Sequence, residues 1–104
     1  MRQVMVRYTV KQDQAEENAR LIGEVFAALS RTAPEGLTYS AYVLEDGVSF
    51  VHVASMLDAA SNPLQQLPEF KAFTAGVKER CEVQPVTTTL REIGSYSAEG
   101  AWSR

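Results

Sequence analysis

Hydrophobic and polar residues alternate through residues 37–44 and again through residues 48–56, on either side of Asp46 and Gly47. A period of two residues is typical of β-strands, and an Asp-Gly pair between two such runs predicts a hairpin with a two-residue turn that needs positive φ at both positions. Residues that pair across this turn have numbers that sum to 93. One face of the hairpin is then nearly all apolar and carries the only histidine of the chain: Leu37, Tyr39, Ala41, Val43, Val48, Phe50, His52, Ala54 and Met56.

The segment before the hairpin predicts one strand and one long helix. Residues 3–11 alternate in the manner of a half-buried strand. A helical period follows in residues 14–33, where Asp13 and Glu16 are expected to cap the N-terminus, and Pro34 with Gly36 is expected to end the helix. The predicted apolar stripe of this helix contains Ala15, Ala19, Ile22, Val25, Phe26 and Leu29.

The segment after the hairpin predicts a short helical turn, a second helix and a fourth strand. Asn62 and Pro63 have the order of a cap followed by a first helical residue, and Pro68 can open a helix that extends to about Glu82. The β-branched residues at 86–93, which follow Pro85, predict the last strand. The inner stripe of the second helix contains Phe70, Phe73, Val77 and Cys81.

The predicted order β-α-β-β-α-β defines the fold class as α+β. Right-handed crossovers through both helices give a ferredoxin-like sandwich, in which a four-stranded antiparallel sheet carries two helices on one face. Residues 1–95 are predicted to form the domain and residues 96–104 a C-terminal tail. For Trp102 in this tail three interpretations stay open: a disordered end, a segment packed across a partner subunit, or a cover over a pocket.

The second face of the hairpin has no charged residue, although a sheet face in water usually carries several. It contains Thr38, Ser40, Tyr42, Leu44, Ser49, Val51, Val53 and Ser55. An uncharged apolar patch of this kind is typical of a protein interface. We therefore expect a homodimer whose two sheets pack face to face as an α+β barrel.

Composition excludes several classes of partner. The chain is 45% hydrophobic and 22% charged, with a net charge of -3 and no basic stripe, so neither nucleic acid nor an acidic membrane is an expected partner. No apolar run reaches the roughly 20 residues of a membrane span, and no signal peptide is recognisable, so a cytoplasmic protein is expected. The single cysteine, Cys81, excludes an internal disulfide and a multi-cysteine metal site.

Candidate chemistry gathers around His52, because histidine is the side chain whose ordinary pKa lies near neutrality. A lone histidine on an apolar face is either a core residue bonded to a backbone carbonyl or a tyrosine hydroxyl, or a residue that lines a pocket. Tyr8 and Tyr39 are expected on the same face, and Asn18 at the edge of the buried stripe of the first helix. Metal binding is not expected, since no second histidine completes a site.

Four segments carry a resemblance to a known family: residues 4–10, 34–39, 50–53 and 67–73. Together with the order of elements, they make residues 2–95 similar to the antibiotic-biosynthesis-monooxygenase-like group of the dimeric α+β barrel superfamily. This resemblance implies a ligand cavity between the sheet and the helices of each subunit. It also implies a cofactor-free monooxygenase-like enzyme that acts on a small aromatic or enolic compound.

The resemblance also suggests roles for particular residues. His52 would be the base or proton shuttle, Tyr39, Asn18 and Tyr8 would orient the substrate, and Phe70 with Phe73 would form an apolar wall. No cofactor is expected; haem is disfavoured because no predicted helix has a histidine and the only tryptophan lies in the tail. The alternative is a non-catalytic small-molecule-binding or interaction protein with the same fold.

Overall fold

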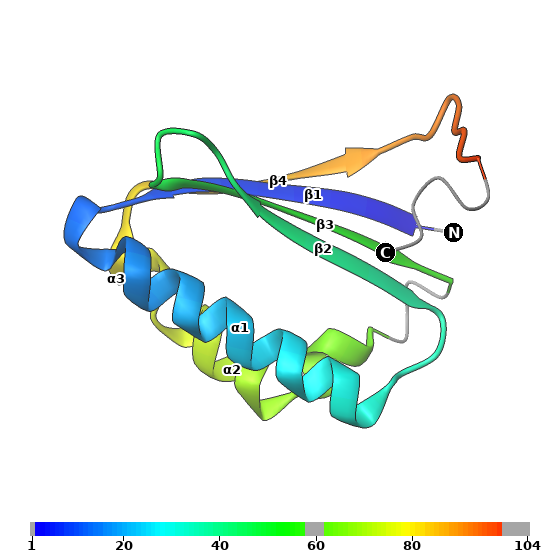
Figure 1. Cartoon of the computed structure of the whole chain (residues 1–104), viewed down its shortest axis with the longest axis horizontal. Coiled ribbons are helices and arrows are strands. Elements are labelled where there is room, and N and C mark those ends of the chain that lie inside the picture. Colours follow the sequence, from blue (N-terminus) through cyan, green and yellow to red (C-terminus); the bar gives the residue numbers. More distant parts are fainter. Residues whose placement is uncertain (1, 58–61, 99–104) are drawn as a thin grey trace.

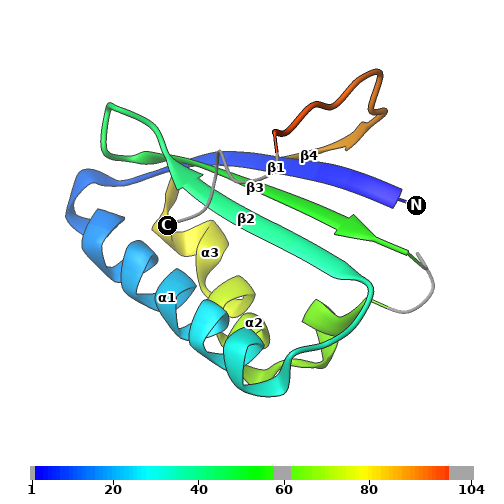
Figure 2. The ribbon, with the colours of Figure 1, turned by 45° about the vertical axis from the view of Figure 1, so that its right-hand side comes forward.

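The computed structural model describes residues 2–57 and 62–98, and it confirms the predicted α+β sandwich. The antiparallel sheet has the strand order β2-β3-β1-β4, and the helices lie on one of its faces (Figures 1 and 2). The elements follow one another along the chain as β1 (Arg2–Val10), η1 (Gln12–Gln14), α1 (Ala15–Thr32), β2 (Leu37–Val43), β3 (Ser49–Met56), η2 (Pro63–Gln66), α2 (Pro68–Ala75), α3 (Val77–Arg80) and β4 (Cys81–Leu90).

The hairpin of β2 and β3 has the predicted register, with Tyr39 opposite Ala54 and Ala41 opposite His52. The predicted two-residue turn is wrong, because Gly47 has positive φ (78°) and Asp46 does not. The Asp46 carboxylate instead accepts hydrogen bonds from the backbone N–H of Val48 at 3.0 Å and of Ser49 at 2.8 Å. The turn is therefore longer than predicted, and a side chain supplies its acceptors.

The first helix begins and ends within one residue of the predicted bounds, but its cap differs. Asp13 lies in the preceding 3₁₀ helix, and the N-cap residue is Gln14, which makes no side-chain capping bond. At the other end Ala33 adopts a left-handed conformation with φ of 45°, and its N–H bonds the carbonyl of Leu29 at 2.7 Å. Proline at position 34 disfavours helical geometry at Ala33, which accounts for this ending.

The second helix is shorter than predicted and the fourth strand begins earlier. The helical segment is interrupted at Gly76, and Cys81 opens β4 rather than closing a helix. Pro85, predicted to precede the strand, lies inside it. The pairing of β1 with β4 shifts by one residue between Arg7 and Thr9, and Pro85 falls in this irregularity at the edge of the sheet. A proline is tolerated there because an edge strand with a bulge leaves some N–H groups unpaired.

The core lies between the helices and the inner sheet face, with Tyr8, Val10 and Val25 at most 2% exposed. Val43, predicted on the core face, is 56% exposed, because it stands at the end of the edge strand β2. The stripe of α1 is also rotated relative to the prediction. Asn18, expected at its edge, is 0% exposed, while Ala19 lies on the surface.

None of the helices among residues 2–57 and 62–98 has both the length and the apolar character required to traverse a lipid bilayer. The segment after β4 has no regular structure through residue 98, and Tyr96 within it is 88% exposed. Trp102 lies outside the described residues, so the three interpretations of its role stay predictions.

Candidate functional site

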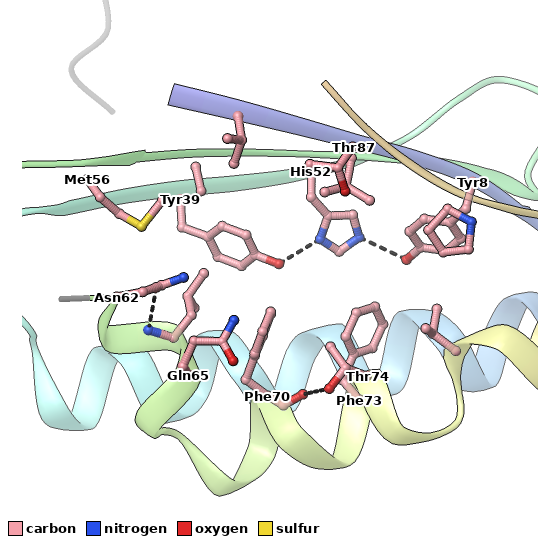
Figure 3. A pocket seen from close by; sticks show the side chains of 16 residues that line it. Tyr8, Tyr39, His52, Met56, Asn62, Gln65, Phe70, Phe73, Thr74 and Thr87 are labelled. Carbon is pink, nitrogen blue, oxygen red and sulfur yellow. Dashed lines mark hydrogen bonds between the residues drawn. The ribbon is translucent and has the colours of Figure 1, made fainter. Parts of the chain in front are cut away.

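A cavity of about 300 Å³ lies between the sheet and α2 (Figure 3). Strands β1, β3 and β4 form its roof with Tyr39 of β2, while η2, α2 and α3 form its floor. Its aromatic lining consists of Tyr8, Tyr39, His52, Phe70 and Phe73, and its other polar side chains are Asn62, Gln65, Thr74 and Thr87. A space of this size in a mostly apolar wall with a few polar groups is typical of a small-molecule site.

His52 projects from β3 toward the helices and lies between two tyrosines (Figure 3). Its Nε2 atom is 2.8 Å from the hydroxyl of Tyr8, and its Nδ1 atom is 2.6 Å from the hydroxyl of Tyr39. The two interpretations of this histidine, a core residue bonded to a tyrosine and a residue that lines a pocket, are therefore compatible. His52 lines the cavity, and each ring nitrogen is hydrogen-bonded to a tyrosine.

The hydrogen-bond chain continues beyond Tyr8 into the core. Asn18 donates from Nδ2 to the Tyr8 hydroxyl at 2.9 Å, and Arg80 donates from Nε to Oδ1 of Asn18 at 3.1 Å. Arg80 is 8% exposed, donates a second bond to the carbonyl of Phe73 at 2.9 Å, and lies 5.2 Å above the Phe73 ring. Five side chains thus form one continuous polar chain through an otherwise apolar core.

Aromatic packing fixes the positions of the three rings in this chain. The Tyr8 ring stacks on Phe50 with centroids 5.6 Å apart, and the Tyr39 ring stacks on Phe26 at 5.2 Å. The imidazole of His52 lies 5.5 Å from the ring of Phe73. Buried aromatic pairs of this kind restrict ring motion, so the hydroxyl groups are held at their hydrogen-bonding positions.

Burial keeps these titratable groups neutral. It lowers the pKa of His52 from its ordinary 6.5 to about 4. Burial also raises the pKa of Tyr8 to about 12, although the hydrogen bond from Asn18 acts in the opposite direction. The pKa of Tyr39 is raised for the same reason. Near pH 7 the imidazole and both phenols are therefore uncharged.

The structure brings together most of the side chains that the sequence singled out. His52, Tyr8, Tyr39, Phe70 and Phe73 all line the cavity. Asn18 does not line it and reaches it only through Tyr8. In the described part of the chain, no group of three or more His, Cys, Asp or Glu side chains could hold a metal ion.

Several residues that line the cavity or belong to the hydrogen-bond chain gave no signal in the sequence. Arg80 lies between Glu79 and Cys81 in a short charged run that is typical of a solvated surface, and its burial depends on the junction of α3 with β4. Thr87 and Gln65 reach the cavity from an edge strand and a 3₁₀ helix. Their positions follow from tertiary packing, which neither periodicity nor motif spacing encodes.

Neither a protein-family model nor a curated protein matches the amino-acid sequence, whereas solved structures match its fold. A protein described as an antibiotic biosynthesis monooxygenase is 15% identical, with a TM-score of 0.72 over 90% of this chain and 100% of that one. The Rv0793 protein from Mycobacterium tuberculosis is 19% identical, with a TM-score of 0.73 over 92% of this chain and 98% of its own.

A variant of SnoaB, described as a cofactor-independent oxygenase from Streptomyces nogalater, is 14% identical. Its TM-score is 0.67 over 90% of this chain and 94% of its own. At these identities the likeness concerns the fold. The fold predicted from the resemblance to the antibiotic-biosynthesis-monooxygenase-like group is therefore confirmed.

Proposed function

We propose that this protein is a cofactor-independent, monooxygenase-like enzyme that acts on a small aromatic or enolic compound. The observation that carries the proposal is the Tyr39 hydroxyl, which lies at the wall of an aromatic cavity and is bonded to Nδ1 of His52 at 2.6 Å. Further support comes from the fold shared with SnoaB, which is described as a cofactor-independent oxygenase.

Tyr39 is the proposed contact with the reacting oxygen of the substrate. A hydroxyl in apolar surroundings can donate a hydrogen bond to an oxygen on which negative charge develops, and this bond is stronger there than in water. Both nitrogens of His52 are occupied by tyrosine hydroxyls, so the proposed role of His52 is that of a proton shuttle that acts through Tyr39. Phe70 and Phe73 would pack against the ring of the substrate and exclude water.

The proposed reaction consumes molecular oxygen and needs no further oxidant. A substrate with a CH₂ group conjugated to a carbonyl, as in an anthrone, loses one proton to give an enolate, and the enolate reduces O₂. One oxygen atom then replaces the two hydrogens of the CH₂ group as a new carbonyl oxygen, and the other leaves as water. The part proposed for the protein is to stabilise the enolate and to move protons.

One observation favours the alternative, a non-catalytic small-molecule-binding protein. The ring nitrogens of His52 are both used within the protein, so the histidine has no free nitrogen for direct contact with a ligand. The same cavity could then hold a ligand without reaction.

Oxygen consumption separates the two functions. Purified protein is supplied with a panel of anthrones and hydroquinones in ¹⁸O₂, and both uptake and product mass are followed. The proposed enzyme consumes O₂ faster than a protein-free blank and places one ¹⁸O atom in the quinone formed from an anthrone. Saturable binding without uptake, across a panel that includes tight ligands, would reject the enzyme and support the binding protein.

We also propose that two copies pair through their sheets. The helices leave one face of the sheet uncovered (Figure 1). By the strand register, Tyr42 (57% exposed) lies on this face opposite Val51 of β3, and Val86 (60% exposed) lies on it opposite Arg7 of β1. Met5 and Val53 form a cross-strand pair on the same face. These two rows of the sheet carry one charged residue, Arg7, which lies between Val51 and Val86. A largely uncharged sheet face of this kind is typical of a protein interface.

A further inference from the structure

The donor and the acceptor of each hydrogen bond between Arg80 and Tyr39 can be assigned by starting from Arg80. A guanidinium group only donates, so the atom of Asn18 that faces Arg80 at 3.1 Å must be the carbonyl oxygen Oδ1. The amide nitrogen of Asn18 therefore faces Tyr8, and Nδ2 donates to the Tyr8 hydroxyl at 2.9 Å. Arg80 thus sets which end of the Asn18 amide meets the tyrosine.

The next two bonds follow from this orientation. The Tyr8 oxygen already accepts from Asn18, and Tyr8 is only 2% exposed, so its own hydrogen needs the nearby Nε2 of His52 as acceptor, at 2.8 Å. The opposite arrangement would leave the buried Tyr8 hydrogen without an acceptor among these partners, which native proteins avoid. A neutral imidazole that accepts at Nε2 carries its hydrogen on Nδ1 and donates it to Tyr39.

We propose that Arg80 is a positioning residue that acts through Asn18 and Tyr8 to hold His52 as the Nδ1–H tautomer, so that the hydroxyl hydrogen of Tyr39 is left to point into the cavity. The ligand must then present a hydrogen-bond acceptor at Tyr39, namely a carbonyl or enolate oxygen. This statement about the ligand deepens the proposed function and rests on it. The tautomer does not depend on any reaction.

The surroundings of Arg80 support this role. The side chain is 8% exposed, and among residues 2–57 and 62–98 no carboxylate forms an ion pair with it. Its bonds go to Asn18 and to the carbonyl of Phe73, and a Cβ atom at Gly76 would lie 3.0 Å from its Nη1. A buried cation without a carboxylate partner is costly. The hydrogen bonds that Arg80 donates to Oδ1 of Asn18 and to the carbonyl of Phe73 offset part of this cost, and the first of them fixes the orientation of the Asn18 amide.

The tautomer can be measured directly, because His52 is the only histidine of the chain. With ¹⁵N-histidine at pH 7 in the ligand-free protein, Nδ1 is expected to give the resonance of a protonated nitrogen and Nε2 that of an unprotonated one. A protein that instead holds its hydrogen on Nε2 would overturn the proposal.

Asn18→Asp tests the direction of the chain with almost no change in shape. A carboxylate only accepts, so the Tyr8 hydroxyl would donate to the new carboxylate and its oxygen would be free to accept from Nε2–H. The tautomer is expected to invert, and the new carboxylate can pair with Arg80, which favours folding. An Asn18→Asp protein that is folded and keeps the Nδ1–H form would contradict the proposal.

Two arginine variants separate positioning from general stability. Arg80→Lys keeps a donor toward Asn18 and is expected to preserve the Nδ1–H form, whereas Arg80→Met removes the donor and is expected to give a mixture of tautomers. Arg31→Met changes an exposed arginine and serves as the matched control. An Arg80→Met protein that is folded and retains a single Nδ1–H form would show that Arg80 does not set the tautomer of His52 through Asn18 and Tyr8.

The ligand class is tested with a matched pair of probes, 1-tetralone and tetralin, which differ in one carbonyl. Tyr39→Phe is expected to weaken binding of the ketone by roughly threefold to tenfold, the value of one hydrogen bond, and to leave tetralin binding unchanged. Equal effects on both probes would contradict the proposal that the ligand presents a hydrogen-bond acceptor to Tyr39. Neither result depends on oxygen consumption, so failure of the enzymatic function and failure of this inference are distinguishable.

Discussion

The hydroxyl of Tyr39 lies 2.6 Å from Nδ1 of His52, the only histidine of the chain, and both side chains line the cavity. The two side chains come from neighbouring strands, and their rings are held by stacking on Phe26 and by packing against Phe73. This pair is therefore a rigid donor and acceptor unit in the roof of the cavity. Its properties lead to predictions about stability as well as about chemistry.

The buried His52 should make the protein less stable in mild acid. Its pKa is about 4 in the folded protein and near 6.5 when exposed, so between these values the unfolded chain binds more protons. Stability is therefore full above pH 6.5 and falls as the pH drops toward 4. From pH 7 to pH 5, urea denaturation should show a loss of roughly 2 kcal/mol from this group alone.

His52→Gln is the control for this loss. Glutamine can keep one donor and one acceptor near the tyrosines but does not titrate. The variant should lose less stability than the wild type between pH 7 and pH 5, even if it is less stable at pH 7. An equal loss in both proteins would assign the acid sensitivity to other groups.

Two glycine substitutions should have opposite effects on stability. Gly47 has φ of 78°, where alanine is strained, so Gly47→Ala should destabilise the protein by about 1 kcal/mol. Gly23 lies on the exposed side of α1, and a Cβ there meets nothing within 4 Å, so Gly23→Ala should stabilise by about 0.5–1 kcal/mol. Thermal unfolding of both variants checks the signs, and the same sign for both would contradict the assigned turn or helix.

The hairpin turn should depend on Asp46. Its carboxylate accepts from two backbone N–H groups and from the Ser49 hydroxyl at 2.6 Å, and these bonds hold its pKa below the ordinary value. Asp46→Ala should lower the urea midpoint, whereas Glu45→Ala on the same turn should leave it nearly unchanged. The Asp46 contribution is present above its ordinary pKa and disappears as the pH falls through the lowered value, so the two variants should converge in strong acid.

If two copies pair through their sheets, a carboxylate added to the uncovered sheet face should dissociate the dimer. Val86 is 60% exposed in the single subunit, so Val86→Asp should leave the fold intact and shift the sedimentation coefficient from that of a dimer to that of a monomer. Ala27→Asp, on the exposed side of α1, introduces the same charge away from the sheet and should remain dimeric. A wild-type protein that sediments as a monomer at micromolar concentration would refute the dimer.

The order of elements and the hairpin register could be predicted from sequence because they depend on local period. The alternation that put His52 opposite Ala41 is fixed by the pleat of a strand, and the structure confirms this pair. The same alternation predicts Val43 on the core face, but Val43 is exposed, since burial also depends on whether a strand end is covered. The sequence predicts Pro85 before the fourth strand and the structure has it inside that strand, because a bulge in an edge strand leaves no periodic pattern in the sequence.

The cavity could be predicted only in part. Tyr8, Tyr39 and His52 share a face in any sheet of this order, so their proximity follows from topology. Arg80 could not be predicted, because its burial requires α3 to turn directly into β4 and place a guanidinium beside Asn18. Residues that act through another side chain have no motif of their own.

The most direct test of the proposed function is oxygen uptake by Tyr39→Phe with the best substrate of the anthrone and hydroquinone panel. Removal of one hydroxyl that stabilises an oxyanion should lower kcat/KM about 100-fold. Tyr96→Phe makes the same change on a side chain that is 88% exposed, and it should retain wild-type kcat/KM. Equal rates in the two variants would contradict the account, because Tyr39 would then have no contact with the reacting oxygen.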